Sequence, residues 1–228
     1  AKNSFEIIEL GDKRLLKKIT DGEHAGQKFV EKGILFIKNS AVRDYNINLL
    51  EGFYISEEKH KKLKRSALKP DDVLLTTIGH LGSSAIVSEI LGEVNINQNL
   101  VKIEIDKDFL DPYYLSAYLN SGIVKKQIAS LFTGNLQSIL TYPKIKILKI
   151  IIPEKEFIEE ISSLLKKSVL LDNESFKMVK DAQKTLMRLL DIPIYQKEKL
   201  FQTKLSLIKN VDLWTPSYSQ PLYKNILL

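Results

Sequence analysis

The sequence predicts an α+β protein in which a domain with a mixed or antiparallel sheet is followed by one long helix. Short β-branched segments separated by glycine and polar turns fill the chain up to residue 152, and their length and partial alternation are typical of strands. Residues 154–190, in contrast, contain no glycine or proline, and apolar residues recur there at helical spacing. We therefore expect a first domain over residues 1–152, a long helix over 153–191 and a partly helical tail of unknown role over 192–228.

Five segments of the first domain have the pattern of strands. β-Branched residues favour an extended backbone, and glycine or polar clusters bound each run. The expected strands are residues 33–38, 72–78, 84–88, 100–105 and 145–152. A helix is expected over 112–131, because Asp111 is a favourable N-cap and proline is well tolerated at the first helical position.

The long helix carries an apolar stripe. Its first turns are rich in glutamate, which the positive end of the helix dipole favours. Apolar residues at an alternating spacing of four and three form a seam that a partner helix would cover, on a helix that we expect to project from the domain. The predicted partner-helix residues are Phe157, Ile161, Leu164, Leu171, Met178, Ala182 and Leu189. The alternative is a break near residues 171–174 that folds the helix back as a hairpin.

The composition favours a polyanionic partner and argues against metal chemistry. The formal net charge is +6, which points to nucleic acid or an anionic membrane surface. There is no apolar run of about eighteen residues, and the first residues lack the order of a signal peptide, so we expect a cytoplasmic protein. Without cysteine, and with three scattered histidines, the chain is expected to hold neither a metal nor another cofactor.

No pattern in the sequence makes a convincing catalytic site. The Asp-Pro-Tyr-Tyr run at 111–114 partly matches the Asp/Asn-Pro-Pro-Tyr motif of amino-methyltransferases, but helix capping explains the same residues. Asp44 with the Glu-Glu-Lys run at 57–59 fits a nuclease pattern that lysine-rich chains produce by chance. Glycine-rich phosphate loops and a Ser-His-Asp arrangement are missing. We therefore expect no catalytic residue in this chain.

Polar loops and a run of basic residues form the candidate binding site. Asn and Gln can form two hydrogen bonds to adenine, Arg and Lys can do the same with guanine, and glycine lets a backbone approach a surface closely. We call the basic run at residues 59–65 the cationic ridge. The predicted DNA-binding residues are Thr20, Asp21, Gly22, His24, Lys59, Lys61, Lys62, Lys64, Arg65, Thr76, Thr77, Gly79, His80, Gly82, Asn97, Gln98, Asn99, Gly134, Asn135 and Gln137. Plain turn chemistry is the alternative for each loop, and a solvated helix face is the alternative for the ridge.

Taken together, these segments resemble the DNA specificity subunits of type I restriction-modification systems. The motifs, in chain order, are ITDGEH at 19–24, GILFI at 33–37, YIS at 54–56, LKPDDVLLT at 68–76, NQN at 97–99, YLSAYLNS at 114–121, GNLQ at 134–137 and IIIP at 150–153. The resemblance covers about residues 5–190. The chain departs from the family pattern at Asp72, where glycine is usual, and after His24, where proline often follows.

The resemblance implies a target-recognition domain followed by a conserved helix. In that family, two such domains, separated by an antiparallel pair of helices, recognise the halves of a split site in double-stranded DNA and bind DNA methyltransferase (modification) subunits, with which a restriction subunit can associate. With one domain and one helix, this chain resembles a half-subunit that forms a homodimer through its helix or belongs to a larger specificity subunit. Two alternatives remain: the recognition part of a combined methyltransferase and endonuclease, and an assembly protein whose charge is incidental.

Overall fold

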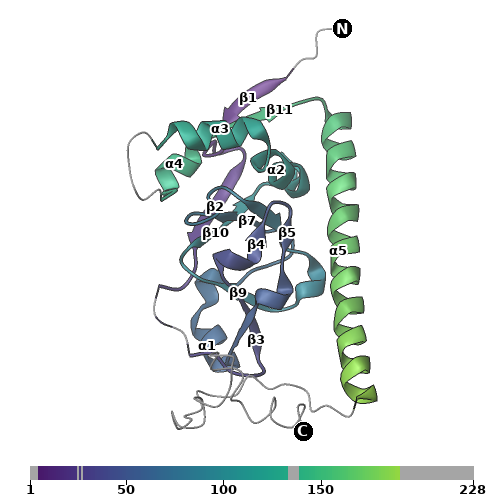
Figure 1. Cartoon of the computed structure of the whole chain (residues 1–228). Coiled ribbons are helices and arrows are strands. Elements are labelled where there is room, and N and C mark those ends of the chain that lie inside the picture. The colour runs from purple at the N-terminus through teal and green to yellow at the C-terminus, as the bar shows by residue number, and fades with distance from the viewer. Residues whose placement is uncertain (1–4, 25, 27, 133–138, 191–228) are drawn as a thin grey trace, which may run out of the picture. The chain divides into compact units, whose positions relative to one another are not determined.

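The computed structural model describes residues 5–24, 26, 28–132 and 139–190 (Figure 1). The chain divides into two compact units, residues 1–178 and 179–228, and the described part of the second is the end of the long helix and the residue after it. The first unit combines small, mostly antiparallel sheets with helices, so the predicted α+β class with a long terminal helix is confirmed. None of the helices in the described ranges is long and apolar enough to cross a membrane.

The strands of the described residues form four small sheets. The strands are β1 (Glu6–Glu9), β2 (Leu16–Asp21), β3 (Ile34–Ile37), β4 (Val42–Arg43), β5 (Asn46–Ile47), β6 (Phe53–Ile55), β7 (Val73–Thr76), β8 (Ser84–Ile86), β9 (Val94–Ile96), β10 (Leu100–Ile105) and β11 (Lys149–Ile152). The largest sheet is antiparallel in the order β2-β10-β7-β8, and the sheet β6-β3-β9 contains a parallel pair, β3 with β9. The pairs β1-β11 and β4-β5 make up the other two.

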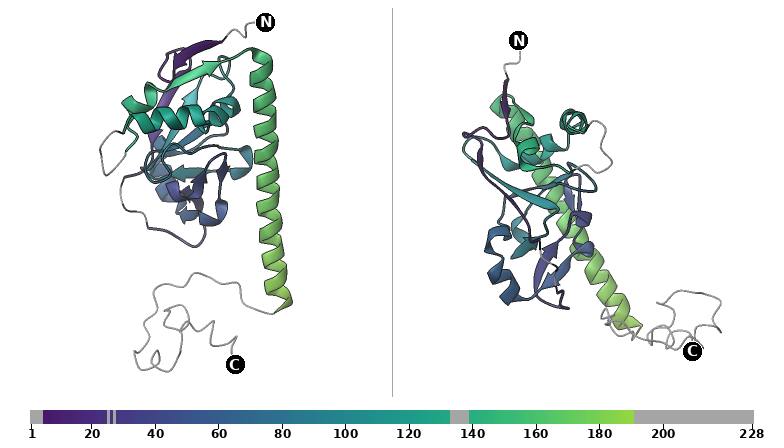
Figure 2. Two further views of the ribbon diagram at one scale, coloured as in Figure 1. Left: turned by 45° about the horizontal axis from the view of Figure 1, so that its top comes forward. Right: turned by 90° about the vertical axis from the view of Figure 1, so that its left-hand side faces the viewer.

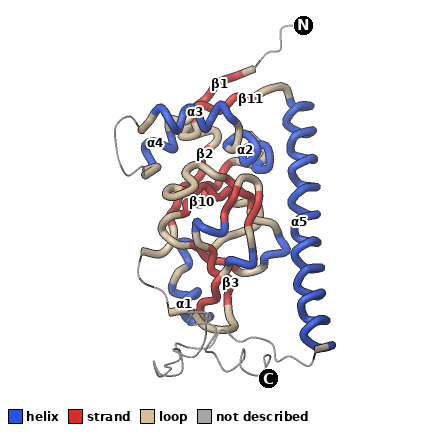
Figure 3. Tube along the Cα trace, in the orientation of Figure 1, coloured by secondary structure: helices blue, strands red, loops and turns tan. Residues whose placement is uncertain are grey.

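Five α-helices accompany these sheets in the part of the chain that the structure describes. They are α1 (Glu57–Lys62), α2 (Pro112–Leu119), α3 (Gly122–Ser130), α4 (Tyr142–Lys146) and α5 (Lys155–Leu189). Short 3-10 turns follow β3 at Asn39–Ala41 and α1 at Lys64–Ser66, and two more lie at Leu49–Glu51 and Glu89–Leu91. In Figure 3, helices α2, α3 and α4 lie at one end of the domain and α1 lies at the other, with most of the strands between them.

The helix predicted over 112–131 is two helices rather than one. Asp111 does cap the first, accepting hydrogen bonds from the backbone nitrogens of Tyr113 at 2.7 Å and Tyr114 at 3.3 Å. The chain then turns, because Ser121 caps a second helix. Asn120 bonds both the backbone nitrogen and the carbonyl of a β8 residue, at 2.8 Å each, and this contact with the sheet holds the end of α2 in place.

The strand predicted over 145–152 is wrong in its first half. Residues 142–146 form α4, with proline in its first turn, and Ile145 and Leu148 are buried around that turn. The ladder with β1 begins only at Lys149, which pairs with Glu9, and ends where Ile152 pairs with Glu6. The apolar residues before Lys149 fit the strand pattern, but no strand in the described part of the chain pairs with them. Ile145 and Leu148 are buried because they lie in and next to a short helix.

The central sheet is buried on both faces. Along β7, Val73 and Leu75 belong to a core beneath α2 and α3, while Leu74 belongs to a second core against β3 and β9. In β10, Val101 and Leu100 divide between the two cores in the same way. Burial on both sides explains why β7 is a nearly continuous apolar run rather than an alternating one.

The turn before β7 places left-handed backbone at Asp71, with φ of 69°. This is the conformation that favours glycine, so the position in this turn that suits glycine is Asp71 rather than Asp72, where the sequence comparison placed it. Asp72 is 5% exposed and accepts a hydrogen bond from the backbone nitrogen of Lys69 at 2.7 Å. Burial raises the pKa of Asp72, although Lys102 lies 3.6 Å away.

Helix α5 is unbroken over its length, so the hairpin alternative is wrong. The sequence also predicted that this helix projects from the domain, and for its first half that prediction is wrong. Leu165 and Val169 are buried against Ile86 of β8, and Tyr113 of α2 packs against this cluster. Farther along, the Asp172 carboxylate accepts a hydrogen bond from Asn46 at 2.8 Å. The helix therefore has one face on its own domain through this stretch (Figure 2).

Candidate nucleic-acid interface

Three of the predicted loops meet at one end of the central sheet. Asp21, the last residue of β2, pairs with Val101 near the start of β10, and Thr76, the last residue of β7, pairs with Leu100. Because neighbouring strands run antiparallel, the loops that follow β2 and β7 and the loop that precedes β10 emerge together. We call this end of the sheet, with residues 20–24, 76–82 and 97–99, the loop edge.

Backbone contacts join the first and last of these loops closely. The backbone nitrogen of Glu23 donates to the carbonyl of Ile96 at 3.1 Å, and that of Gln98 donates to the carbonyl of Glu23 at 3.1 Å. Gly22 lies between them, and a Cβ there would fall 2.2 Å from the carbonyl oxygens of Ile96 and Asn97. Glycine is therefore required at this position by the close approach of the two backbones.

A cluster of amide side chains holds the middle of the loop edge. The side-chain oxygen of Asn39 accepts hydrogen bonds from Asn97 at 3.4 Å and Asn99 at 3.5 Å, and its nitrogen donates to the Ile78 carbonyl at 3.1 Å. Asn39 therefore bridges two loops, although nothing in its local sequence distinguishes it from an ordinary turn residue. The buried side-chain oxygen of Asn97 has no hydrogen-bond partner among the described residues, and the same is true of Thr20.

Asp21 is the centre of a charged cluster at one side of the loop edge. Its carboxylate binds Arg65 at 2.6 Å and His24 at 2.5 Å, and its backbone nitrogen donates to the Tyr142 hydroxyl at 2.6 Å. Burial alone would raise the pKa of Asp21, but hydrogen bonds from Arg65, His24 and Tyr142 outweigh it and lower the pKa. Asp21 is thus charged at neutral pH and holds Arg65 in place. Tyr142, the first residue of α4, was not found from the sequence, which predicted neither a helix nor a binding residue at this position.

The residues of the cationic ridge belong to two elements, helix α1 and the 3-10 turn that follows it. Ser56 caps α1, and this short helix carries Lys59, Lys61 and Lys62, with Lys62 paired to Glu58 at 2.6 Å. Lys61 and Lys64 are exposed to solvent, as a solvated helix face requires. Of the ridge residues, Arg65 is the one that reaches the loop edge, where it also donates to the Gly22 carbonyl at 3.3 Å.

The predicted residues of the loop edge differ in their exposure. Five are buried and shape the loops, so that a duplex would meet backbone groups rather than these side chains: Thr20, Gly22, Thr76, Thr77 and Gly82. The Thr76 hydroxyl, for example, is bonded across its own turn to the carbonyl of His80 and the nitrogen of Ser83. The exposed members are His24, Gly79, His80 and Gln98. Gly134, Asn135 and Gln137 lie outside the described residues.

The run at 111–114 is structural in this fold. Tyr114 is 4% exposed, and its hydroxyl donates to the Ile151 carbonyl at 2.7 Å. Burial raises the pKa of Tyr114 to about 12. A buried, bonded ring is not available to stack on a base, so the geometry gives no support to a methyltransferase motif here. Within the described ranges, no group of three or more His, Asp or Glu side chains is placed to hold a metal ion.

Comparison with known proteins identifies relatives of one kind. No family model matches the chain. Over 96 residues, the chain is 28% identical to the type I restriction enzyme EcoBI specificity subunit of Escherichia coli, a match that covers 42% of this chain and 20% of that protein. The crystal structure of the HsdS subunit from Thermoanaerobacter tengcongensis aligns with 80% of the chain at a TM-score of 0.50 and 16% identity.

The chain has the fold of a type I specificity subunit. The S subunit of the type I restriction-modification system from M. genitalium aligns with 82% of it at a TM-score of 0.53 and 12% identity. A chain from a study of the assembly and conformational transition of a type I R-M system aligns with 82% of it at a TM-score of 0.50 and 17% identity. The resemblance found in the sequence is thereby confirmed.

The chain matches a part of each of the solved specificity subunits. The chain spans less than half the length of the proteins that it matches, since it covers 41% of the T. tengcongensis chain and 45% of the M. genitalium chain. Within this span, the sheets, the loop edge and α5 all lie in the described residues.

Proposed function

We propose that this chain recognises a specific sequence in double-stranded DNA as one target-recognition unit of a type I specificity subunit. The observation that carries the proposal is the convergence of three polar loops, distant in sequence, at one end of a rigid sheet. The similarity to the EcoBI specificity subunit supports it, and so does the net charge of +6. In this proposal residues 1–152 form the recognition domain.

The exposed side chains of the loop edge would contact base edges. Gln98 is exposed on a loop fixed by backbone bonds, and an amide there can form the paired hydrogen bonds that distinguish adenine. Exposed lysines of the cationic ridge, such as Lys61 and Lys64, would bind phosphates and orient the domain without contributing sequence information. The buried threonines and the amide cluster would fix the loop shapes that make such contacts reproducible.

Helix α5 would join this domain to a second one. Four of the stripe residues predicted from the sequence face solvent within the first unit: Phe157 is 47% exposed, Leu164 63%, Leu171 56% and Met178 68%. Ile161 is the exception, because it is partly buried and packs against the core of its own domain. Residues that pack on the domain, such as Leu165, lie about 100° around the helix from this stripe, so α5 has two apolar faces and one of them is uncovered.

The charges of α5 suit an antiparallel partner of the same kind. Acidic residues gather near its start, at Glu156, Glu159 and Glu160, and basic residues near its end, at Lys177, Lys180, Lys184 and Arg188. An antiparallel pair of these helices brings acidic and basic ends together. A homodimer of this form would recognise an inverted repeat whose spacing the helices set. In a larger specificity subunit, the second helix would come from the same protein.

The wider function of the unit would depend on other proteins. We place DNA methyltransferase subunits, and through them a restriction subunit, among its partners, and we assign the catalytic steps to those subunits rather than to this chain. A cytoplasmic location follows from that function, because chromosomal and incoming DNA are both met there.

Selection of duplexes from a random pool by the full chain tests this proposal. A shared motif among the bound duplexes is expected, together with a solution mass that shows whether the motif is a doubled half-site. The Gln98→Ala variant should lose about 1–3 kcal/mol of discrimination at one base position. The Lys61→Ala variant is the matched control, since it should weaken binding to all sequences alike. Bound duplexes without a shared motif, or methyl transfer from S-adenosylmethionine by the chain alone, would contradict the proposal.

A further inference from the structure

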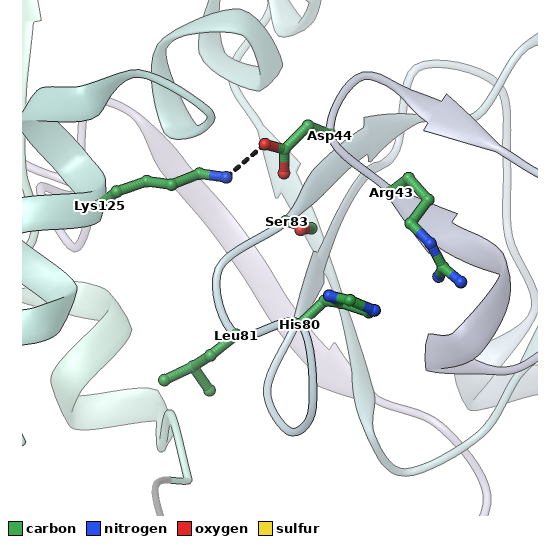
Figure 4. A pocket seen from close by; sticks show the side chains of 6 residues that line it. All are labelled: Arg43, Asp44, His80, Leu81, Ser83 and Lys125. Carbon is green, nitrogen blue, oxygen red and sulfur yellow. Dashed lines mark hydrogen bonds and ion pairs between the residues drawn. The ribbon is translucent and has the colours of Figure 1, made fainter.

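A polar pocket of about 440 Å³ opens beside the turn that follows β7 (Figure 4). Its lining residues are Arg43, Asp44, His80, Leu81, Ser83 and Lys125. They come from three separate elements, the β4-β5 hairpin, the β7-β8 turn and α3. Apart from His80, none of these residues was predicted from the sequence to bind a ligand, and Asp44 was considered only in a nuclease pattern that arises by chance. The fold brings them together.

Two cations, Arg43 and Lys125, and one carboxylate, Asp44, line the pocket. Lys125 is bound to the Asp44 carboxylate, and the two side chains are 39% and 40% exposed. Burial would raise the pKa of Asp44, but hydrogen bonds from Lys125 and Ser83 and the charge of Lys125 lower it, so Asp44 is ionised at neutral pH. Arg43 lies 3.7 Å from Glu51, and its guanidinium also donates to nearby backbone carbonyls. An exposed ion pair of this kind is weak and leaves the cation available to an anionic ligand.

A chain of contacts connects this pocket to the loop edge. His80 follows Gly79, which has a left-handed φ of 81° and lies against Asn39. Asn39 in turn bonds Ile78 and the amides of the loop at 97–99, and that loop contacts the loop of Asp21. The pocket thus adjoins the loop edge at the β7-β8 turn, whose residues His80 and Leu81 line it.

We propose that this pocket binds a phosphate group of the DNA backbone, beside the bases that the loop edge contacts. The inference rests on the proposed function and adds a site to it. Nη1 of Arg43 donates to the carbonyls of Ser40 and Val42, while Nη2, 3.7 Å from Glu51, is left as a cationic donor. Lys125 offers a point charge from the opposite wall, and the two cations together suit an anion. Asp44 competes with the phosphate for the Lys125 ammonium, because the two side chains form an ion pair.

Paired variants of neighbouring lysines test the site. Lys125→Gln should weaken binding about eightfold at 0.1 M salt and reduce the slope of log K against log salt by about 0.9, with the difference fading toward 1 M salt. Lys126→Gln makes the same charge change at the next residue of α3, outside the pocket, and should have a smaller effect. The loss should be equal for a selected duplex and an unrelated one, because phosphate contacts carry no sequence information.

Asp44→Asn separates a binding site from a structural ion pair. If the pocket binds phosphate, removal of the carboxylate should strengthen binding and Lys125→Gln should weaken it. If the pair only ties the hairpin to α3, both variants should lower the melting temperature alike and change DNA binding in the same direction. That result would overturn the inference, and so would equal binding by Lys125→Gln and Lys126→Gln.

A second probe distinguishes failure of this site from failure of the proposed function. Pyrophosphate binding to the wild-type chain, followed by ³¹P line broadening, should be reduced in Lys125→Gln but not in Lys126→Gln. If the wild-type chain binds pyrophosphate in this pocket but selects no DNA, the phosphate is not that of a DNA target, and the proposed function fails while the anion site stands. If it binds neither, both are overturned.

Discussion

Replacing Leu171 by glutamate should weaken self-association of the chain without unfolding the recognition domain. Leu171 is 56% exposed on the outward stripe of α5, and Leu170, the next residue back, is 53% exposed on another side of the helix. The two leucines thus have nearly equal exposure in the monomer, while a partner helix on the stripe would cover Leu171 alone. Leu170→Glu is therefore a matched control.

The size of the effect follows from the surface that remains to be buried. Full burial of a leucine side chain contributes about 1.5–3 kcal/mol, and roughly half of the Leu171 surface is still exposed, so each copy would gain about 0.8–1.5 kcal/mol on pairing. A two-fold dimer contains the contact twice, so Leu171→Glu should cost about 1.5–3 kcal/mol. This corresponds to a dissociation constant roughly 10-fold to 150-fold higher, before any repulsion between the two carboxylates.

Sedimentation equilibrium over a range of protein concentrations measures that constant directly. We expect a wild-type dimer, a nearly unchanged Leu170→Glu variant and a Leu171→Glu variant that is monomeric at concentrations where the wild type is not. Circular dichroism should show the same helix content and melting transition for all three. Equal weakening by both substitutions would refute the assignment of the stripe, and a wild-type chain that stays monomeric throughout would refute pairing with a second copy.

Two further predictions concern the loop edge. Gly22→Ala should destabilise the domain by about 1–3 kcal/mol or more in chemical unfolding, because the new Cβ would overlap two backbone carbonyls, whereas Gly26→Ala, with open space around it, should have little effect. Arg65→Gln should lower the unfolding free energy by about 1 kcal/mol at pH 7, the upper end for a partly exposed pair, while Lys62→Gln at a fully exposed pair should cost less. Because the pKa of Asp21 is lowered, its contribution is complete above a carboxyl pKa of about 4 and is lost as the pH falls through the lowered value, so the Arg65→Gln difference should vanish in acid; a difference that persists there would contradict the role of Asp21.

Sequence patterns were reliable where a structural preference is local. The strand over Leu100–Ile105 and the cap at Asp111 were predicted at the positions where they occur, because β-branching and capping act within a few residues. The single long helix was likewise predicted close to its observed bounds, since a run without glycine or proline has few competing conformations. The fold brings the loops at 20–24, 76–82 and 97–99 to one end of the sheet, while their role in DNA binding stays a prediction.

Patterns failed where the outcome depends on a distant partner. The apolar run at 145–152 fits a strand or a buried helix equally well, and only the four-residue partner β1 decides where pairing begins. The sequence does not distinguish one basic residue of the cationic ridge from another, yet it is Arg65 that binds Asp21, which lies 44 positions earlier. Asn39 and Tyr142 have unremarkable neighbours along the chain and became visible only through their contacts across the fold.

The two apolar faces of α5 show most clearly which features the local sequence decides and which depend on the tertiary structure. The sequence by itself determined that residues 155–189 form a helix with an apolar stripe, because helix propensity and the spacing of side chains are properties of the local chain. Which apolar face packs on the domain was decided only by the tertiary structure, where Leu165 and Val169 meet Ile86 and leave Leu164 and Leu171 in solvent. Burial is a property of two surfaces that meet, and a one-dimensional pattern describes only one of them.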